Sequence, residues 1–236
     1  MAKEFTVDGN TLALWHMNGT VASAAKKDNA EGTAGLDLVE SNTPTATDGF
    51  DGATNGAYGI NGSNQKVESA GSVTDGTQTA LSIEGWFYAD SLASVKFLCS
   101  QSAGGAGMLL YHNGTSLILR TRYSGGGGDQ DTPGHTITTG QWYYIAGTVD
   151  GPSGTSRLYV DGDEKQTKAM TGASGNLGST VCTIGAIGGG NFFAGRPDEV
   201  RISDTDRSAA EILAYWESQS ATGVDHQNLI TLMGIQ

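Results

Sequence analysis

Short apolar segments that alternate with polar residues, separated by glycine-containing turns, constrain this chain more than any other feature. The stretch GQWYYIAGTVDGPSGTSRLYVDGDEKQ, residues 140–166, contains two such segments, with an Asp-Gly-Pro-Ser-Gly turn between them and a further Asp-Gly turn after them. Asp-Gly and Asn-Gly dipeptides tolerate positive φ angles, and they therefore close β-hairpins. The stretch predicts a β-hairpin followed by another tight turn.

The same pattern continues through the whole sequence of 236 residues, which contains 36 glycines and only 4 prolines. Asp-Gly or Asn-Gly turns separate about ten short strand-like runs, a pattern that is typical of an antiparallel sandwich. We therefore predict an all-β fold, an antiparallel jelly-roll β-sandwich. The glycine-rich residues 104–107 and 124–135 are predicted to be long flexible loops.

A single helix is expected near the C-terminus. Ser208 with Glu211 three residues later forms a capping-box pattern. The apolar residues that follow at helical spacing are Ile212, Leu213 and Trp216. The pattern predicts one short helix over about 209–218, with these apolar residues packed on the sandwich.

The predicted helix also defines the expected domain organisation. Residues 1–218 are predicted to form one jelly-roll domain, and residues 219–236 a C-terminal tail that contains the apolar run LITLMGI. Such a run tends to associate with other apolar surfaces if it is left exposed. We consider two interpretations of the tail, a last strand that docks on its own domain and an assembly arm that docks on a partner.

Charge and hydropathy exclude some classes of partner. The net charge is −12, with 13 basic and 25 acidic residues, which argues against a nucleic-acid partner because phosphate binding needs a cationic face. The first residues, MAKEFTVDGN, lack the apolar core of a signal peptide. No apolar run approaches the roughly 18 residues that cross a membrane, so we expect no membrane insertion. The protein is then either trimmed or used without the secretion route.

Two cysteines lie far apart in the sequence, each in a strand-like run. Cys99 is in KFLCS and Cys182 is in TVCTIG. Two interpretations are open: a disulfide, which requires the two strands to be neighbours, and a pair of buried free thiols. We favour the free thiols.

Several segments, taken in order, carry a family resemblance. They are LALWHMNGT (12–20), LSIEGWFYADS (81–91), TTGQWYYIAGTVDG (138–151), SRLYVDGDE (156–164), TIGA (183–186) and FFAGRPDEVRISDTDRSAAEI (192–212). Over about residues 5–216 the chain resembles the laminin G-like, concanavalin A-like lectin modules. The resemblance implies a jelly roll that binds glycans, other proteins or cell surfaces. It also implies a structural calcium in some members and glycoside hydrolysis in some relatives on the same fold.

The acidic residues do not match the enzymatic relatives. The resemblance implies that a hydrolase would carry its carboxylates on one strand as Glu-x-Asp-x-x-Glu, whereas no Glu in this chain has an Asp two residues later. A retaining mechanism needs two carboxylates about 5 Å apart. The nearest pair, Asp198 and Glu199, is adjacent in sequence and is expected on opposite faces of a strand. We therefore predict a protein that is not an enzyme.

The resemblance also implies a calcium site that ties the loop after the first strand to an acidic pair. The matching oxygen-bearing residues are Asn18, Asp28, Asp198 and Glu199. Oxygen ligands of this kind are what calcium prefers. The alternative is structural, with Asp198 capping a turn and Glu199 paired with a base such as Arg201.

Counting with a period of two predicts a face for ligand binding. Leu81, Ile83 and Phe87 are expected to point into the core, and so are the matching residues of the other strands. The residues then expected together on one outer face are Glu84, Trp86, Tyr88, Arg120, Arg122, Trp142, Tyr144 and Tyr159. Aromatic rings stack on sugars and arginine binds carboxylates, so an acidic glycan is one ligand for such a face. The alternative is that Trp86 and Trp142 are packing residues.

Two functions remain after these exclusions. The first is a binding or display module on the surface of a larger particle, such as a phage virion decoration, fibre or tail protein that recognises glycans. Its partners would be a glycan or protein surface, with a homo-oligomer or capsid and tail proteins as assembly partners. The second is a stand-alone carbohydrate-binding lectin module. Either places the protein at an extracellular or virion surface.

Overall fold

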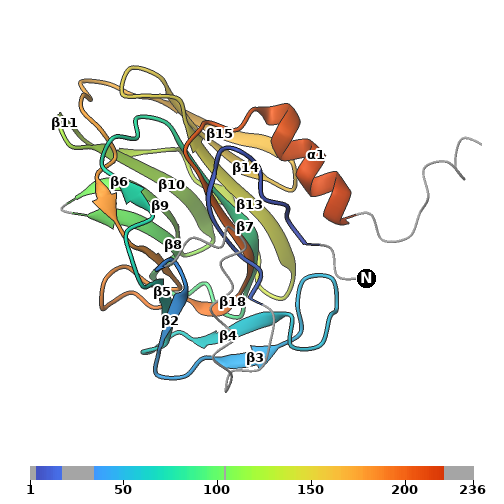
Figure 1. Cartoon of the computed structure of the whole chain (residues 1–236). Helices are drawn as coiled ribbons and strands as arrows, with labels where there is room; N and C mark the ends of the chain where they lie inside the picture. The colour runs from blue at the N-terminus through green and yellow to red at the C-terminus, as the bar shows by residue number, and fades with distance from the viewer. Residues whose placement is uncertain (1–3, 18–34, 104, 221–236) are drawn as a thin grey trace, which may run out of the picture.

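The computed structural model describes residues 4–17, 35–103 and 105–220 of the chain (Figure 1). The strands within these residues are β1 Thr11–Trp15, β2 Leu38–Ser41, β3 Thr45–Thr47, β4 Ala57–Asn61, β5 Lys66–Ser69, β6 Thr74–Asp75, β7 Leu81–Ala89, β8 Val95–Ala103, β9 Ala106–Asn113, β10 Ser116–Tyr123, β11 Gly126–Asp131, β12 His135–Thr136, β13 Trp142–Val149, β14 Thr155–Val160, β15 Asp163–Ala169, β16 Ser179–Thr180, β17 Cys182–Ile184 and β18 Ala194–Ser203. One helix is described, α1 at Ala209–Ser220.

The strands form two stacked antiparallel sheets, so the predicted jelly-roll sandwich is confirmed (Figure 1). The helix-covered sheet has the order β15-β14-β13-β7-β18-β4-β3, with β1 paired to β18. The arginine sheet, named for Arg120 and Arg122, has the order β11-β10-β9-β8-β17-β5-β2, with β12 paired to β10. A short β16-β6 pair stands apart from both sheets. Figure 1 shows α1 lying across the outer side of β13–β15.

The core lies between the sheets and consists of the residues that the period of two places inside. Leu81, Ile83 and Phe87 of β7 meet Leu117 and Leu119 of β10 in a single buried cluster. Tightly packed apolar side chains of this kind supply most of the free energy of folding of such a domain. The predicted inner faces are confirmed.

The stretch from 140 to 166 forms the expected hairpin. Strands β13 and β14 pair antiparallel, with Ile145 opposite Val160. The next turn leads into β15, and its two central residues, Asp161 and Gly162, have φ angles of 52° and 82°. Two positive φ angles define the turn that matches strand twist in tight hairpins.

The two segments predicted as long flexible loops are shorter than expected. Residues 126–131 and 135–136 form β11 and β12, and β9 already begins at Ala106. β11 pairs with β10, with Arg120 opposite Asp131 and Thr121 opposite Gln130. Backbone pairing along an existing strand here outweighs the poor intrinsic β-propensity of glycine.

Helix α1 begins as predicted and ends later. Ser208 N–H donates to Glu211 Oε2 (2.8 Å), and Glu211 N–H donates to Ser208 Oγ (3.3 Å), which confirms the capping box. Ile212 is fully buried, but Leu213 is 37 % exposed, so its predicted core position is wrong. Together with Trp216, it packs instead against the turn at Gly162.

The expected boundary between domain and tail at residue 219 is also wrong. Helix α1 continues to Ser220, and Gln219 accepts a hydrogen bond from Trp86 Nε1 at 2.6 Å. Gln219 therefore belongs to the sandwich. The rest of the predicted tail, residues 221–236, lies outside the described residues.

The cysteines lie on neighbouring strands as buried free thiols. Cys99 of β8 and Cys182 of β17 are fully buried, with their Sγ atoms 3.4 Å apart. Within residues 4–17, 35–103 and 105–220, no helix is long and apolar enough to cross a membrane.

Candidate functional site

The outer face of the helix-covered sheet is closed rather than open to ligands. Six of the predicted ligand-binding residues do share this face, as the period of two requires: Glu84, Trp86, Tyr88, Trp142, Tyr144 and Tyr159. Four of them are at most 6 % exposed: Glu84, Trp86, Tyr144 and Tyr159. Phe5, Phe50 and Ile212 cover them, and Phe50 stacks on Trp86 with ring centroids 4.5 Å apart. The expectation of an exposed ligand face is therefore wrong for these four residues.

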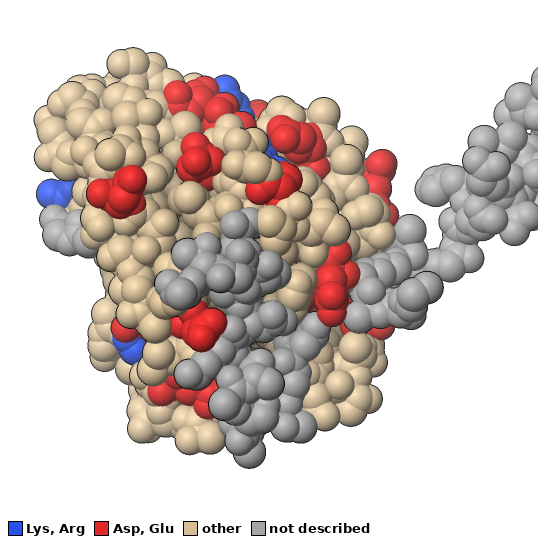
Figure 2. Space-filling view, in the orientation of Figure 1, with Lys and Arg blue, Asp and Glu red and all other residues tan. Residues whose placement is uncertain are grey.

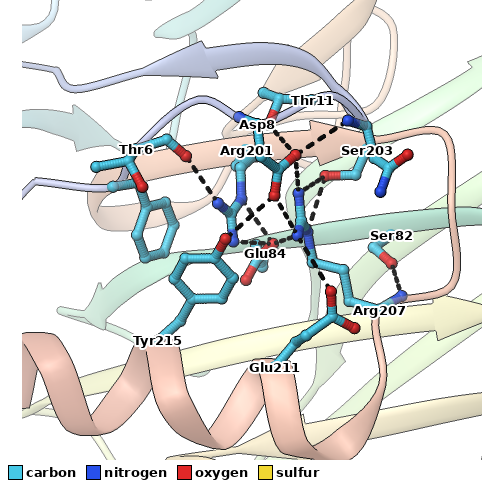
Figure 3. Close-up of polar contacts among 12 residues, drawn as sticks. Thr6, Asp8, Thr11, Ser82, Glu84, Arg201, Ser203, Arg207, Glu211 and Tyr215 are labelled. Atoms are coloured by element: carbon cyan, nitrogen blue, oxygen red, sulfur yellow. Dashed lines mark hydrogen bonds and ion pairs between the residues drawn. The ribbon is translucent and has the colours of Figure 1, made fainter.

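A buried ionic network fixes this cover in place (Figure 3). Glu84 Oε1 lies 2.8 Å from both Nε and Nη2 of Arg201 and 3.1 Å from Nε of Arg207, and all three side chains are fully buried. The other carboxylate oxygen of Glu84 accepts a hydrogen bond from the Tyr144 hydroxyl. Burial and the Glu84 carboxylate raise the pKa of Tyr144 well above its ordinary value. One buried carboxylate thus contacts two buried guanidinium groups.

The network reaches the N-terminal segment and the helix. Arg207 donates to both carboxylate oxygens of Asp8, at 2.8 and 2.9 Å. Arg201 donates to the carbonyl of Thr6 at 3.1 Å and lies 3.8 Å from the centroid of the Tyr215 ring. Charged groups of opposite sign and cation–π contacts therefore hold segment 4–8, β18 and α1 together over the aromatic cluster.

Substitution of Glu84 tests the network. Glu84→Gln leaves Arg201 and Arg207 buried with less compensating charge, and we expect it to lower the free energy of unfolding by about 3–5 kcal/mol. The measurement is denaturant-induced unfolding. The matched control is Glu164→Gln, a half-exposed partner of Arg157, for which we expect less than about 1 kcal/mol. Equal effects of the two substitutions would contradict the network.

The Asp8–Arg207 pair predicts a dependence of stability on pH. Hydrogen bonds from Arg207 hold the pKa of Asp8 well below its ordinary value. The pair therefore contributes fully above the ordinary pKa of Asp, about 4, and less as the pH falls below it. We expect acidification from pH 6 to pH 2.5 to lower the melting temperature of the native chain more than that of Asp8→Asn. An equal decrease in both would contradict this account.

The acidic pair of β18 is arranged by a β-bulge. The register against β7 shifts between Asp198 and Arg201, and Glu199 has a φ of 50°. Both carboxylates therefore face the covered aromatic cluster: Phe50 N–H donates to Asp198 Oδ2 (3.1 Å), and Phe5 N–H donates to Glu199 Oε2 (2.6 Å). The expectation that they point to opposite faces is wrong, because a bulge breaks the alternation of a strand.

The two carboxylates differ in their fitness for calcium. Both oxygens of Glu199 lie within 2.9 Å of His16 Nδ1, so the expected partner Arg201 is wrong and Glu199 is already engaged. Asp198 Oδ1 is buried without a hydrogen-bond partner. Burial and the neighbouring Glu199 charge raise the pKa of Asp198 well above its ordinary value. Asp198 thus has a buried oxygen without a partner, whereas both oxygens of Glu199 have one.

The remaining calcium candidates cannot be placed. Asn18 and Asp28 lie outside the described residues. Within the described part of the chain, no group of three or more His, Cys, Asp or Glu side chains is arranged to hold a metal ion. Asp198 alone does not complete a calcium site, since calcium takes six to eight oxygen ligands.

Arg120 and Arg122 lie on the outer face of the other sheet, so the prediction that all eight residues share one face is wrong. Arg120 is fully engaged there. Its Nε and Nη2 contact the two oxygens of Asp131 (2.7 and 2.8 Å), and its Nη1 lies 2.9 Å from Asp129. Its guanidinium also lies 5.3 Å from the centroid of the Tyr111 ring. Such a bidentate pair holds Arg120 in one geometry.

Arg122, two residues along the same strand, has free donors. Its side chain is 47 % exposed, and its nearest charge is Asp129 at 3.6 Å. No hydrogen bond joins it to any residue that the structure describes. The guanidinium packs over Gly105, where a Cβ atom would lie 3.1 Å from Nη1. The absence of a side chain at Gly105 thus allows Arg122 its position.

Two hollows adjoin on either side of Arg122. The smaller, of 180 Å³, is lined by Leu109, Ile187, Arg120 and Asp129 among others. The larger, of 320 Å³, is lined by the glycine-rich turn at 124–128 and by Ser179. Arg122 therefore lines both hollows, which are together called the groove at Arg122.

Asp129 and Asp131 lie within residues 124–135, which the sequence predicts to be a flexible loop, and are therefore not among the predicted site residues. The signal that would have identified them is an Asp-x-Asp pattern that could pair with the Arg-x-Arg pattern of the preceding strand, and Asp131 does lie opposite Arg120. The run of four glycines before them hid this signal, because it indicated a loop.

On the face shown in Figure 2, acidic side chains are widely spread and basic side chains are sparse. Such a face does not attract a polyanion.

Residues 61–213 match the family model of the concanavalin A-like lectin/glucanases superfamily. The match covers more than half of the 236 residues. The chain belongs to this superfamily. The resemblance inferred from the sequence is thereby confirmed. Membership does not choose between the lectins and the glucanases of the superfamily, because one fold hosts both.

Solved structures of the superfamily fold are similar to this chain. The botulinum neurotoxin serotype G binding domain has a TM-score of 0.66 at 13 % identity, covering 90 % of this chain and 52 % of that one. The botulinum neurotoxin DC binding domain in complex with SialylT has a TM-score of 0.62 at 13 % identity, covering 80 % and 48 %. This chain thus spans about half the length of those structures. No curated protein matches the sequence.

Proposed function

We propose that this superfamily member is a non-enzymatic glycan-binding module and that the groove around Arg122 is its site. The observation that carries the proposal is the contrast between two arginines on one strand. Arg120 is neutralised by Asp129 and Asp131. The Arg122 side chain is instead exposed, and its N–H groups donate no hydrogen bond to a described residue. Arg120 then positions Asp129, and Arg122 contacts the ligand.

The chemistry of the groove suits sugar hydroxyl groups. Arg122 supplies N–H donors and Asp129 supplies carboxylate acceptors 3.6 Å away. Leu109 and Ile187 add apolar surface to the smaller hollow. The hollows on both sides of Arg122 suit an extended ligand better than a single small molecule. A few convergent polar groups beside apolar surface are typical of small-ligand sites.

The carboxylates support binding rather than hydrolysis. Asp198 and Glu199 are each only 2 % exposed and lie beneath the cover of the other sheet. Beside the groove, burial acts to raise the pKa of Asp131, but the hydrogen bonds and charge of Arg120 together with the Tyr111 hydroxyl outweigh burial, and the pKa of Asp131 is lowered. A general acid needs the opposite shift, since it must be protonated near neutral pH.

Substitution of Arg122 tests the proposed site. We expect Arg122→Ala to weaken glycan binding at least about tenfold, because hydrogen bonds to a charged donor are worth about 1.5–3 kcal/mol. The measurement is binding of labelled protein to an array of neutral and sialylated glycans, followed by titration calorimetry. The matched control is Arg157→Ala, which removes an arginine of β14 that is paired with Asp150.

The control should bind as the native chain does. Gly105→Ala should weaken binding as well, since its methyl group displaces the Arg122 guanidinium. If the native chain binds none of the glycans, or if Arg122→Ala binds as well as the native chain, the proposed function is wrong.

For calcium, we propose Asp198 as the residue that would ligate the ion, supported by its unpartnered buried oxygen. Calcium supplies charge compensation for that carboxylate when it is bound. Calcium chloride should raise the melting temperature of the native chain relative to EDTA, and Asp198→Asn should abolish this shift. The exposed Asp204→Asn should retain it. A native chain whose melting temperature is the same in calcium and in EDTA would contradict this proposal.

Action at an extracellular or virion surface, as part of a particle or as a stand-alone lectin, stays a prediction. One solved neighbour is in complex with rat synaptotagmin II and another with SialylT, which supports a protein or glycan surface as the partner. The assembly-arm hypothesis depends on residues 221–236, which lie outside the described part of the chain.

A further inference from the structure

A second pocket lies at the opposite sheet, lined by residues of β3, β4 and β18; Figure 1 shows where these strands lie. Strands β18 and β4 pair at only two positions, Ala194 with Asn61 and Gly195 with Ile60. The pocket opens beyond this pairing and has a volume of 380 Å³, within the usual range for small-ligand sites. It is lined by Thr45, Ala46, Thr47, Gly59, Ile60, Asn61, Gln65, Asp90 and Arg196.

One side of the pocket is rigid. Gln65 donates to the carbonyls of Asn42 (3.0 Å) and Thr43 (2.9 Å) and accepts from the N–H of Asn61 (2.9 Å). The Asn61 side chain accepts from the N–H of Ser63 at 2.9 Å. These amide groups are occupied in holding the loop after β4. They therefore shape the pocket rather than bind a ligand.

The other side carries two polar groups that are not occupied. Arg196 and Asp90 are 3.7 Å apart, with side chains 32 % and 49 % exposed. Neither side chain makes a hydrogen bond to any described residue. The Arg196 guanidinium lies 4.4 Å from the centroid of the Tyr88 ring, which holds it in orientation. Tyr88 in turn packs edge-on against Trp142, with ring centroids 5.6 Å apart.

We propose that this pocket is a second binding site and that it takes a neutral saccharide. An anion attracted to Arg196 meets the Asp90 carboxylate beside it, and a cation attracted to Asp90 meets the guanidinium. A ligand with adjacent hydroxyl groups satisfies both, donating to Asp90 and accepting from Arg196. Thr45 and Thr47 also line the pocket.

The proposal assigns a role to two residues of the aromatic face. Tyr88 and Trp142 remain partly exposed beside this pocket, unlike the four residues beneath the cover. They support Arg196 and are positioning residues rather than ligand contacts. This site does not depend on Arg122, which lies on the other sheet.

The test is NMR of the full ¹⁵N-labelled chain, observing the arginine Nε–H signals. The neutral probes are maltotriose, cellotriose and N-acetyllactosamine, and the anionic probes are sialic acid and inorganic phosphate. We expect at least one neutral probe to shift the Arg196 signal and both anions to leave it unchanged. Arg157, with a side chain 30 % exposed and paired with Asp150, is the internal control signal.

Two variants separate this site from the groove at Arg122. Asp90→Asn should lower the affinity for the probe that shifts the Arg196 signal at least about tenfold, since the substitution removes a charged acceptor. Arg122→Ala should leave the Arg196 shift intact, whether or not it abolishes binding at the groove. The proposal is overturned if none of the neutral probes shifts Arg196, if only the anions do, or if Asp90→Asn binds as the native chain does.

Discussion

The Glu84 carboxylate, buried between Arg201 and Arg207, is the interaction on which the rest of the structure depends. Taking three charges out of water is costly unless they compensate one another. Here the compensation requires β7, β18 and Arg207, two residues before α1, to meet at one point. Asp8 then brings in the N-terminal segment through Arg207. The network therefore dictates which elements cover the aromatic face.

This cover divides the roles of the two sheets. The helix-covered sheet uses Trp86, Tyr144 and Tyr159 of its outer face for packing, whereas Tyr88 and Arg196 stay partly exposed. The outer face of the arginine sheet keeps a groove at Arg122. At both places a guanidinium is held against a neighbour but lies 3.6–3.7 Å from a carboxylate. We propose that these two arginines bind ligands, whereas Arg120 and Arg201 maintain structure.

The fold could be predicted from local sequence patterns. The exposure of the aromatic face could not, because residues distant in the sequence cover it. The period of two placed Leu81, Ile83 and Phe87 in the core, and the Ser208–Glu211 pattern located the helix start. Nothing near Trp86 or Tyr144 indicates that Phe5 and Phe50 cover them.

Two further misses have backbone causes. The side chains of Asp198 and Glu199 were expected on opposite faces of β18. The bulge, with Glu199 at a φ of 50°, places them on the same face. The glycine run before Asp129 indicated a loop, although these residues form β11, which pairs with β10. Neither is visible in a pattern of apolar and polar residues, because both depend on how a neighbouring strand pairs.

The central claim is that the aromatic face is permanently closed, and native-state hydrogen exchange tests it most directly. The account predicts that the amide of Ile212 in α1 exchanges with the same opening free energy as the amides of Trp86 and Tyr144, since cover and sheet unfold together. If Ile212 exchanges through a much easier local opening while Trp86 and Tyr144 stay protected, the helix is a loose lid. The assignment of ligand binding to the other sheet and to the Arg196 pocket would then lose its basis.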